Sequence, residues 1–402
     1  MEAHQFLLAL LIILVSARIF GELAAAIVAP PVIGELVAGI VIGPSLFGWV
    51  ENHELIHLFA EVGVILLLFQ VGMETDVEKL ISAGKESTIV ALGGFFAPLI
   101  AGFCLAYYLF DLPYLVALFI GGTLTATSIG VTVRALTDLG RHNSREGQIT
   151  LGAAVLDDVL GVILLALLYD FTVSGAVNWA NTAKVMIFVG SFFLLAPILA
   201  RLMSSVIQHL DTRIDNPGLI PTTIVSLVLF FAWAAHEAGA PELLGGFAAG
   251  IALSRRFFLP FGLSMHAQPA FSHKIERQML PIIQLFTPIF FVTVGLSLDL
   301  TTVDWSSPLF WYLSISLLAV AILAKFTGAM LLKEPLQRRL IIGIAMMPRG
   351  EVGLIFAGIG ATAGVFDNDV YTALIVVIVY TTLLAPYLMK QRFRKAQHPI
   401  EA

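Results

Sequence analysis

Two adjacent aspartates, Asp157 and Asp158, lie in an apolar run without other charges, and their position calls for a chemical explanation. An ionised carboxylate inside hydrocarbon costs about 3 kcal/mol on insertion scales, so such residues usually serve a function. Neighbouring residues on a helix point about 100° apart, which means that the two carboxylates face different partners. Together they titrate as a coupled pair, and their oxygens suit either protons or a hard monovalent cation. Competition between these two ligands would make a cation/proton exchanger.

A single lysine, Lys325, lies deep in another apolar run, SLLAVAILAKFTGAMLL. Pairing it with one aspartate, while the other carboxylate faces a water-filled cavity, is the least costly arrangement of the three charges. A purely structural salt bridge explains one aspartate and leaves the other without a purpose. The sequence therefore predicts an ion or proton site formed by Asp157, Asp158 and Lys325.

The composition shows which elements must position these residues. The chain has 402 residues, of which 58% are hydrophobic and 12% charged, and its mean hydropathy is +0.92. These values lie outside the range of soluble globular proteins. Apolar runs of about 20 residues match the hydrocarbon core of a bilayer, whereas strands of a membrane barrel would alternate over about ten residues. We expect an all-α polytopic membrane protein.

Apolar runs between polar or Gly/Pro-rich breaks predict thirteen transmembrane helices. Lys and Arg collect on the cytoplasmic side of short loops. With the N-terminus outside and the C-terminus in the cytoplasm, most of the 22 Lys and Arg residues, including Arg134 and Arg141, are assigned to that side. Glu35 and Glu61, near predicted span ends, are expected to have structural or interfacial roles. The predicted spans lie near residues 5–26, 29–44, 55–73, 86–109, 113–137, 146–169, 183–207, 217–236, 240–256, 275–297, 307–331, 336–362 and 369–389.

Two pairs of segments resemble each other across the halves of the chain. GELVAGI (34–40) matches GGFAAGI (245–251), and LLLFQVGMETD (66–76) matches IFFVTVGLSLD (289–299). Seven predicted spans separate the copies, and because this number is odd the second copy enters the membrane in the opposite direction. The sequence thus predicts an inverted-topology repeat of six spans, one linker span and six spans (6+1+6), as secondary transporters use for alternating access.

In this repeat, the predicted span 113–137 corresponds to the predicted span 336–362. Both spans contain residues that interrupt helices. GGTLTATSIG (121–130) supplies Thr, Ser and Gly, and MMPRGEVG (346–353) contains Pro348, which removes a helical hydrogen bond. Interrupted spans at matching positions predict two crossed broken helices around a midplane binding site. Kinks satisfied by neighbouring helices are the structural alternative.

Several of these motifs together resemble a known family. VLDDVLG, TATS, GELVAGIVIGPS, FFVTVGLSLD, Lys325 and PRGE are similar to the second branch of the monovalent cation:proton antiporters, the electrogenic bacterial sodium/proton antiporters. The resemblance covers nearly the whole chain. Relatives resembling potassium-efflux antiporters typically have Gln-Asp, and electroneutral exchangers Asn-Asp, where this chain has Asp157-Asp158.

The resemblance implies a role for each site residue. Asp158 would bind the monovalent cation and exchange protons, while Asp157, a further cation ligand, would form a switchable salt bridge with Lys325. The other implied site positions are Thr127 and Ser128, which would line the crossing of the broken helices, and Thr125, Arg349 and Glu351, which would support it.

The resemblance also implies an organisation and an activity. Within one membrane domain, 1–402, a moving core would comprise 86–170 and 307–389, and a scaffold would comprise 1–85 and 171–306, with a homodimer interface that includes the first and eighth spans. We expect a bacterial inner-membrane antiporter that exchanges cytoplasmic Na⁺ or Li⁺ for external H⁺. The exchange is expected to be electrogenic, and the protein is expected to be a carrier and not an enzyme, with no cofactor and no nucleic-acid partner.

Other functions fit parts of the sequence. Potassium/proton exchange on the same scaffold is the nearest alternative, because side-chain identities do not reveal ion size. A sodium-coupled organic-anion symporter uses a related inverted repeat, although paired buried aspartates disfavour an anion. A passive channel would show no obligatory coupling to protons. HELIH (53–57) matches the zinc-protease pattern H-E-x-x-H, but it lies beside Glu51 at a predicted outer membrane boundary.

Overall fold

The structure is a computed structural model that describes most of the chain. The described residues are 3–27, 29–51, 53–74, 77–174, 219–239, 241–253, 269–298, 300–301, 303–362 and 364–397, with isolated residues between 183 and 202. Within these ranges every regular element is a helix, and nine helical stretches are long and apolar enough to cross a membrane. The predicted all-α membrane protein is therefore confirmed at the level of fold class.

The chain forms two compact units, and the candidate site lies in the first. Unit 1 comprises 1–52, 84–179 and 291–402, and unit 2 comprises 53–83 and 180–290. The helices of unit 1 are α1 (Ala3–Ala26), α2 (Pro31–Ile42), α5 (Gly84–Cys104), the short π-helix η1 (Leu105–Leu109), α6 (Tyr114–Thr125), α7 (Ile129–Asp138), α8 (Arg145–Ser174), α13 (Pro308–Met330), α14 (Leu336–Ala345), α15 (Glu351–Thr362) and α16 (Asn368–Gln397). Those of unit 2 are α3 (Glu54–Glu74), α4 (Val77–Ser82), α10 (Leu219–Glu237), α11 (Glu242–Leu253) and most of α12 (Pro269–Leu296).

The described helices coincide with the predicted spans wherever the comparison can be made. The spans near 113–137 and 336–362 each consist of two shorter helices, α6 with α7 and α14 with α15. The predicted span 183–207 lies largely outside the described residues. The total of thirteen spans and the inverted repeat therefore remain predictions.

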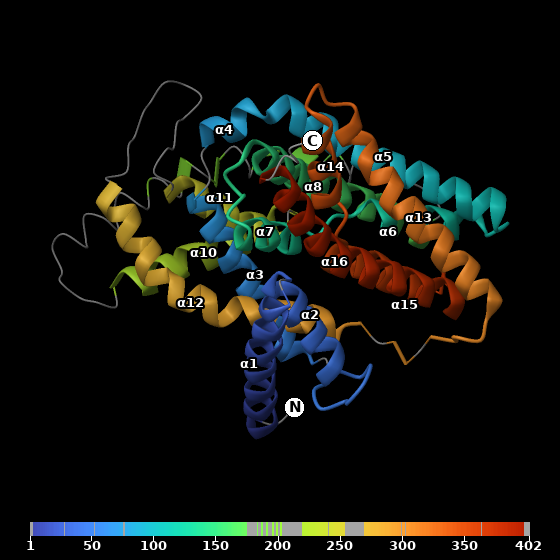
Figure 1. The fold of residues 1–402 in the computed structure, drawn as a ribbon, viewed down its shortest axis with the longest axis horizontal. Helices are drawn as coiled ribbons and strands as arrows, with labels where there is room; N and C mark the ends of the chain where they lie inside the picture. The colour runs from blue at the N-terminus through green and yellow to red at the C-terminus, as the bar shows by residue number, and fades with distance from the viewer. Residues whose placement is uncertain are drawn as a thin grey trace. The chain divides into compact units, whose positions relative to one another are not determined.

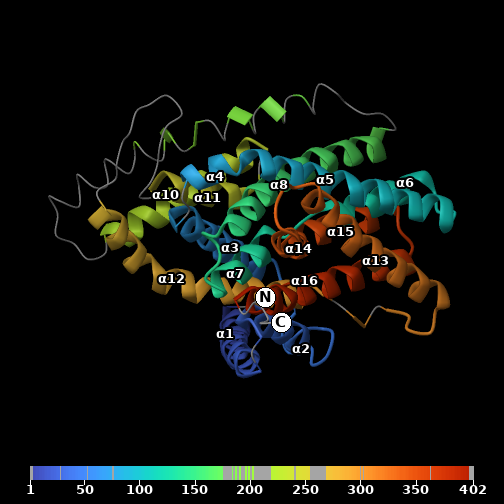
Figure 2. The same cartoon turned by 45° about the horizontal axis from the view of Figure 1, so that its top comes forward.

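Unit 1 packs its long helices around the two interrupted spans. Figures 1 and 2 show α5, α13 and α16 alongside one another, with α6 beside α5. An apolar cluster joins α6, α13 and α16 through Ile120, Phe310, Leu317 and Leu374, all of which are buried. The interrupted segments are thus surrounded by protein, where non-helical backbone is tolerated in a membrane.

Close contact between α5 and α13 depends on two glycines. A Cβ added at Gly93 on α5 would stand 2.5 Å from the Cα of Gly328 on α13, so the two backbones touch. At the neighbouring Gly94, an added Cβ would lie 3.7 Å from Cδ of Lys325, in ordinary contact with its aliphatic part. Small residues permit such close helix crossings in membranes. Here the crossing brings the buried lysine against α5.

We expect Gly93→Ala to destabilise the protein. The added methyl group has no space against the α13 backbone, and overpacking of this kind costs about 1–3 kcal/mol. Gly84→Ala at the start of α5 is the matched control, because no atom lies within 4 Å of its added Cβ. Thermal unfolding of the detergent-solubilised proteins should show a lower Tm for Gly93→Ala alone. Equal values of Tm would contradict the tight crossing.

Glycines also mediate helix contacts elsewhere in unit 1. An added Cβ at Gly39 on α2 would stand 2.7 Å from the Cα of Gly295 on α12. At Gly34, on the same helix, it would stand 2.0 Å from the carbonyl oxygen of Phe20 on α1. α2 is therefore held closely against both neighbours.

Unit 2 contains a corresponding set of contacts. An added Cβ at Gly250 on α11 would stand 2.9 Å from the Cα of Gly72 on α3. At Gly245 it would stand 2.2 Å from the carbonyl oxygen of Phe231 on α10. These glycines belong to the motifs that the sequence analysis paired between the two halves.

Candidate functional site

The first interruption separates α6 from α7. α6 ends at Thr125, residues 126–128 are not helical, and α7 begins at Ile129. The hydroxyl of Ser128 caps α7 by accepting a hydrogen bond from the backbone N–H of Val131 at 3.4 Å. Ser is a favoured N-cap because its oxygen satisfies an N–H that has no partner within the helix. The last carbonyls of α6 are left for other partners.

The second interruption separates α14 from α15 and lies against the first. α14 ends at Ala345 and α15 begins at Glu351, with Pro348 in the connecting segment. The backbone N–H of Ser128 donates to the carbonyl oxygen of Pro348 at 2.8 Å. The hydroxyl of Thr132 on α7 donates to the carbonyl oxygen of Ala345 at 2.8 Å. Both breaks predicted from the sequence are present, and these hydrogen bonds join them.

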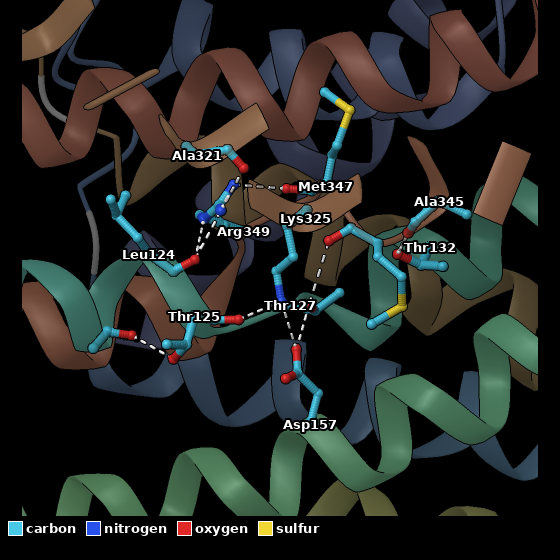
Figure 3. Close-up of polar contacts among 12 residues, drawn as sticks. Leu124, Thr125, Thr127, Thr132, Asp157, Ala321, Lys325, Ala345, Met347 and Arg349 are labelled. Atoms are coloured by element: carbon cyan, nitrogen blue, oxygen red, sulfur yellow. Dashed lines mark hydrogen bonds and ion pairs between the residues drawn. The ribbon is translucent and has the colours of Figure 1, made fainter. Parts of the chain in front are cut away.

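Lys325 on α13 reaches this junction from the side (Figure 3). Its Nζ donates to Oδ2 of Asp157 at 2.9 Å and to the hydroxyl of Thr127 at 2.7 Å. It also donates to the carbonyl oxygen of Thr125, the last residue of α6. The ammonium group thus satisfies a free carbonyl at a helix C-terminus, where the helix dipole favours a positive charge.

Asp157 and Asp158 both lie on α8 and are almost completely buried, with exposed fractions of 1% and 3%. Oδ2 of Asp157 accepts hydrogen bonds from Lys325 and from the hydroxyl of Thr127, while its Oδ1 has no hydrogen-bond partner among the described residues. The charge of Asp158 also attracts Lys325. The structure therefore places both carboxylates near the lysine and forms a direct salt bridge between Lys325 and Asp157.

Arg349 forms a second buried positive centre at the junction. It donates to the carbonyl oxygen of Leu124 from Nε at 3.1 Å and from Nη2 at 2.7 Å. It also donates to the carbonyl oxygens of Ala321 at 2.9 Å and Met347 at 3.1 Å. Its own carbonyl oxygen accepts a hydrogen bond from the hydroxyl of Thr382 at 2.6 Å. This guanidinium holds three segments together through their backbones.

The remaining predicted site residues have more specific roles than the sequence indicated. Thr125 contributes its carbonyl oxygen, while its hydroxyl donates to Gly122 within α6 at 2.7 Å. Ser128 contributes a helix cap and a backbone N–H. Glu351 begins α15, but its side chain lies outside the described part of the structure.

Some residues of the junction were not identified from the sequence because they act through backbone atoms. The carbonyl groups of Leu124 and Ala321 bind Arg349, yet a carbonyl is common to all residues and leaves no signal in the sequence. Thr132 and Thr382 each supply a buried hydroxyl from a helix packed against the junction. Their only sequence signal is a hydroxyl within an apolar run.

We expect Arg349→Lys to destabilise the junction, although it keeps the positive charge. An ammonium group cannot reproduce the planar set of donors that reaches three segments, so some buried carbonyls lose their partner. The loss of stability should be about 2–4 kcal/mol. Thermal unfolding in detergent measures it, with Arg392→Lys on the exposed end of α16 as the control. A Tm equal to that of the control would show that the guanidinium geometry is unimportant.

Comparison with known proteins identifies the family of the chain. A family model described as "Sodium/hydrogen exchanger, transmembrane" matches residues 6–390. The chain is 34% identical to the Na⁺/H⁺-K⁺ antiporter GerN of Bacillus cereus, over 97% of this chain and 96% of that protein. It is 34% identical to the high-affinity Na⁺/H⁺ antiporter NhaS3 of Synechocystis, over 86% of this chain and 73% of that protein.

A solved structure shows the same fold. The structure of the sodium proton antiporter MjNhaP1 from Methanocaldococcus jannaschii matches with a TM-score of 0.73 and 18% sequence identity, covering 100% of this chain and 99% of that chain. At this identity the likeness concerns the fold alone. The expected resemblance to monovalent cation:proton antiporters is confirmed by the sequence comparisons.

Proposed function

We propose that this chain, which belongs to the transmembrane sodium/hydrogen exchanger family, exchanges cytoplasmic Na⁺ or Li⁺ for external protons by alternating access around Asp157 and Asp158. The observation that carries the proposal is the buried set of two carboxylates and Lys325 at the junction of two broken helices. Such a junction can expose carboxylate and carbonyl oxygens to an ion at membrane depth.

The charges of the site explain why uptake of one ion requires release of another. In the proton-loaded state Asp158 carries a proton, while ionised Asp157 is paired with Lys325. A sodium ion that enters adds an uncompensated charge in a low-dielectric region, which is costly, so Asp158 must release its proton. A second proton leaves Lys325 when it separates from Asp157, so that two protons leave for each sodium ion bound. Return of protons then drives the sodium ion out.

We assign the principal cation ligand to Asp158 and the switchable salt bridge to Asp157 and Lys325. Arg349 is tied to three backbone carbonyls, whereas Lys325 shares its contacts among a carboxylate, a hydroxyl and one carbonyl. When the cation arrives, Lys325 would leave Asp157, whose freed oxygens become further cation ligands. Thr127 bonds to both partners of the salt bridge and would guide its closure.

We propose a stoichiometry of two protons per sodium ion, one proton for each of two titrating positions. If two protons enter for each sodium ion that leaves, one net charge moves inward per cycle. That charge couples transport to the membrane potential with about 2.3 kcal/mol per 100 mV. The proposed exchange is therefore electrogenic.

We further propose that the fold is the predicted 6+1+6 inverted repeat. Gly39 meets Gly295, and Gly250 meets Gly72, so each repeated motif contacts the other motif of the opposite half. The same spacing along the chain separates Phe20 from Gly34 and Phe231 from Gly245, which form the other close contacts. A repeat related by a pseudo-two-fold axis accounts for these paired contacts.

The proposed cycle divides the molecule into moving and static parts. In this proposal the core comprises 86–170 and 307–389, and the scaffold comprises 1–85 and 171–306, including a homodimer interface at the first and eighth spans. The protein lies in a bacterial inner membrane with its N-terminus outside and its C-terminus in the cytoplasm. The distribution of Lys and Arg supports this orientation.

Potassium/proton exchange is the second candidate, because the name of the similar protein GerN includes K⁺. Proteoliposomes with a fixed pH gradient distinguish the two when sodium, lithium and potassium are added in turn and proton movement is followed. Responses to sodium and lithium support the proposal. A response to potassium alone would transfer the assignment to the second candidate, and no response to any of the three would refute both.

A further inference from the structure

A second buried charged cluster in unit 1 lies outside the ion site and connects α2 with α7. Nη2 of Arg134 on α7 lies 3.5 Å from Oε1 of Glu35 on α2. Nε of the same arginine lies 3.0 Å from Oδ1 of Asp138, one turn further along α7. The side chains of Glu35, Arg134 and Asp138 are only 6%, 20% and 15% exposed. One arginine is thus shared by carboxylates on two helices.

Asp138 adds a second link between the same helices. Its carboxylate accepts a hydrogen bond from the backbone N–H of Val32, in the first turn of α2. The N-cap residue of α2, Pro30, provides no side-chain hydrogen bond, so the last turn of α7 supplies the cap instead. Lys390 on α16 contributes a further attractive charge to Asp138.

Glu35 is the most weakly held member of the cluster. Its single described ion pair is longer than the pair within α7, and its Oε2 has no hydrogen-bond partner among the described residues. If α7 moves away from α2, Arg134 can keep its ion pair with Asp138, because both residues lie on α7. Separation therefore breaks the contact with Glu35 and leaves the arginine paired.

The position of the cluster relates it to the ion site. α7 begins next to Ser128 at the junction and ends at Asp138, before a segment with Arg141 and Arg145 that the basic-residue pattern assigns to the cytoplasmic side. In the proposed division, α7 belongs to the moving core and α2 to the scaffold. The cluster is therefore a contact between a part that moves and a part that does not.

We propose that Glu35 and Arg134 are positioning residues of the exchange cycle, whose ion pair holds α7 against α2 in the state closed to the cytoplasm and opens in the state open to it. This inference rests on the proposed function. An interaction present in only one of two states shifts their equilibrium, whereas one present in both does not.

Sodium affinities measured from the two sides of the membrane test this pair. In Glu35→Gln the cytoplasm-closed state loses its contact, so the open state gains population. We expect the apparent KM for cytoplasmic sodium to fall about three- to tenfold and that for external sodium to rise. Inside-out and right-side-out membrane vesicles give the two values, and the ratio between them is the readout.

Glu334→Gln is the matched control. Glu334 pairs with Arg338 and lies 3.7 Å from Nε of Arg145, and all three residues belong to the proposed core. Loss of this ion pair should leave the ratio of the two KM values unchanged. An altered ratio in the control would mean that the loss of any ion pair in this region shifts the states, which would remove the case for Glu35.

A ratio in Glu35→Gln equal to that of the parent, or shifted the other way, would overturn the proposal. If Glu35→Gln does not accumulate in the membrane, Glu35→Asp replaces it, because it keeps the charge and shortens the reach, and a smaller shift in the same direction is expected. Absence of any sodium response in the parent protein would refute the proposed function itself, which the same vesicles report independently of the ratio.

Discussion

Asp158→Asn is expected to abolish sodium-dependent proton movement in proteoliposomes, with a loss of at least about 100-fold. Asparagine has nearly the same shape as aspartate, but it neither carries a negative charge nor exchanges a proton. Asp158 is only 3% exposed in this structure, and where the site opens to solvent a water molecule supplies no negative charge to balance the cation. The protein should bind neither transported ion at this position.

Asp304→Asn controls for the chemical change itself. Asp304 lies in an exposed connection before α13, where hydrogen bonds from Ser306 hold the pKa of its carboxyl group below the usual value. The substitution therefore removes the negative charge of a carboxylate that lies outside the ion site. Sodium/proton exchange should persist in this variant. Sodium-dependent proton movement that survives in Asp158→Asn would refute the assignment of Asp158 as cation ligand.

Lys325→Gln is expected to leave exchange active but independent of the membrane potential. Without the ammonium group, Asp157 lacks its direct ionic partner and is expected to stay protonated through the cycle. One of the two proton-linked charges is then lost, and exchange becomes electroneutral. In the parent, 100 mV changes the sodium gradient sustained at equilibrium by about 50-fold, which corresponds to about 2.3 kcal/mol.

Imposed diffusion potentials measure this difference directly. The parent should accumulate or release sodium according to the potential, and Lys325→Gln should not. Lys85→Gln, at an exposed position near the start of α5, is the control and should retain the voltage response. An unchanged voltage response in Lys325→Gln would contradict the salt-bridge switch.

Stability provides a second readout for the same ion pair. Removing one partner of a buried pair costs about 3–5 kcal/mol, because Asp157 is then left without its ionic partner and must take up a proton to stay buried. The double variant Asp157→Asn with Lys325→Gln removes both charges and should recover most of the Tm that Lys325→Gln loses. A double variant less stable than the single one would show that the two residues do not act as a pair.

Much of this molecule was predictable because strong local rules apply in a membrane. The apolar runs had to be helices, since only helices and closed barrels satisfy the backbone in lipid. The cost of buried charges predicted that Lys325 would pair with one of the adjacent aspartates, and the structure selects Asp157. Pro348 and the Thr and Ser residues before α7 marked both helix breaks.

The sequence was less informative about contacts between distant segments. Arg134 was counted with the cytoplasmic basic residues, but it lies within α7 and pairs with a carboxylate on α2. The donors of Arg349 reach the carbonyl oxygens of Leu124 and Ala321, on two other helices. Every residue carries the same backbone carbonyl group. The sequence therefore cannot indicate which carbonyl oxygens will accept a hydrogen bond from Arg349.

What the amino-acid sequence determined by itself was the set of helices, their interruptions and the charges that needed compensation inside the membrane. Only the tertiary structure decided which atoms provide that compensation. The choice depends on how closely the helices approach each other and on the direction in which each free carbonyl points. At the crossing of α5 and α13, for example, a Cβ added at Gly93 would stand 2.5 Å from the Cα of Gly328. These are properties of packed helices, and neither hydropathy nor spacing along the chain contains them.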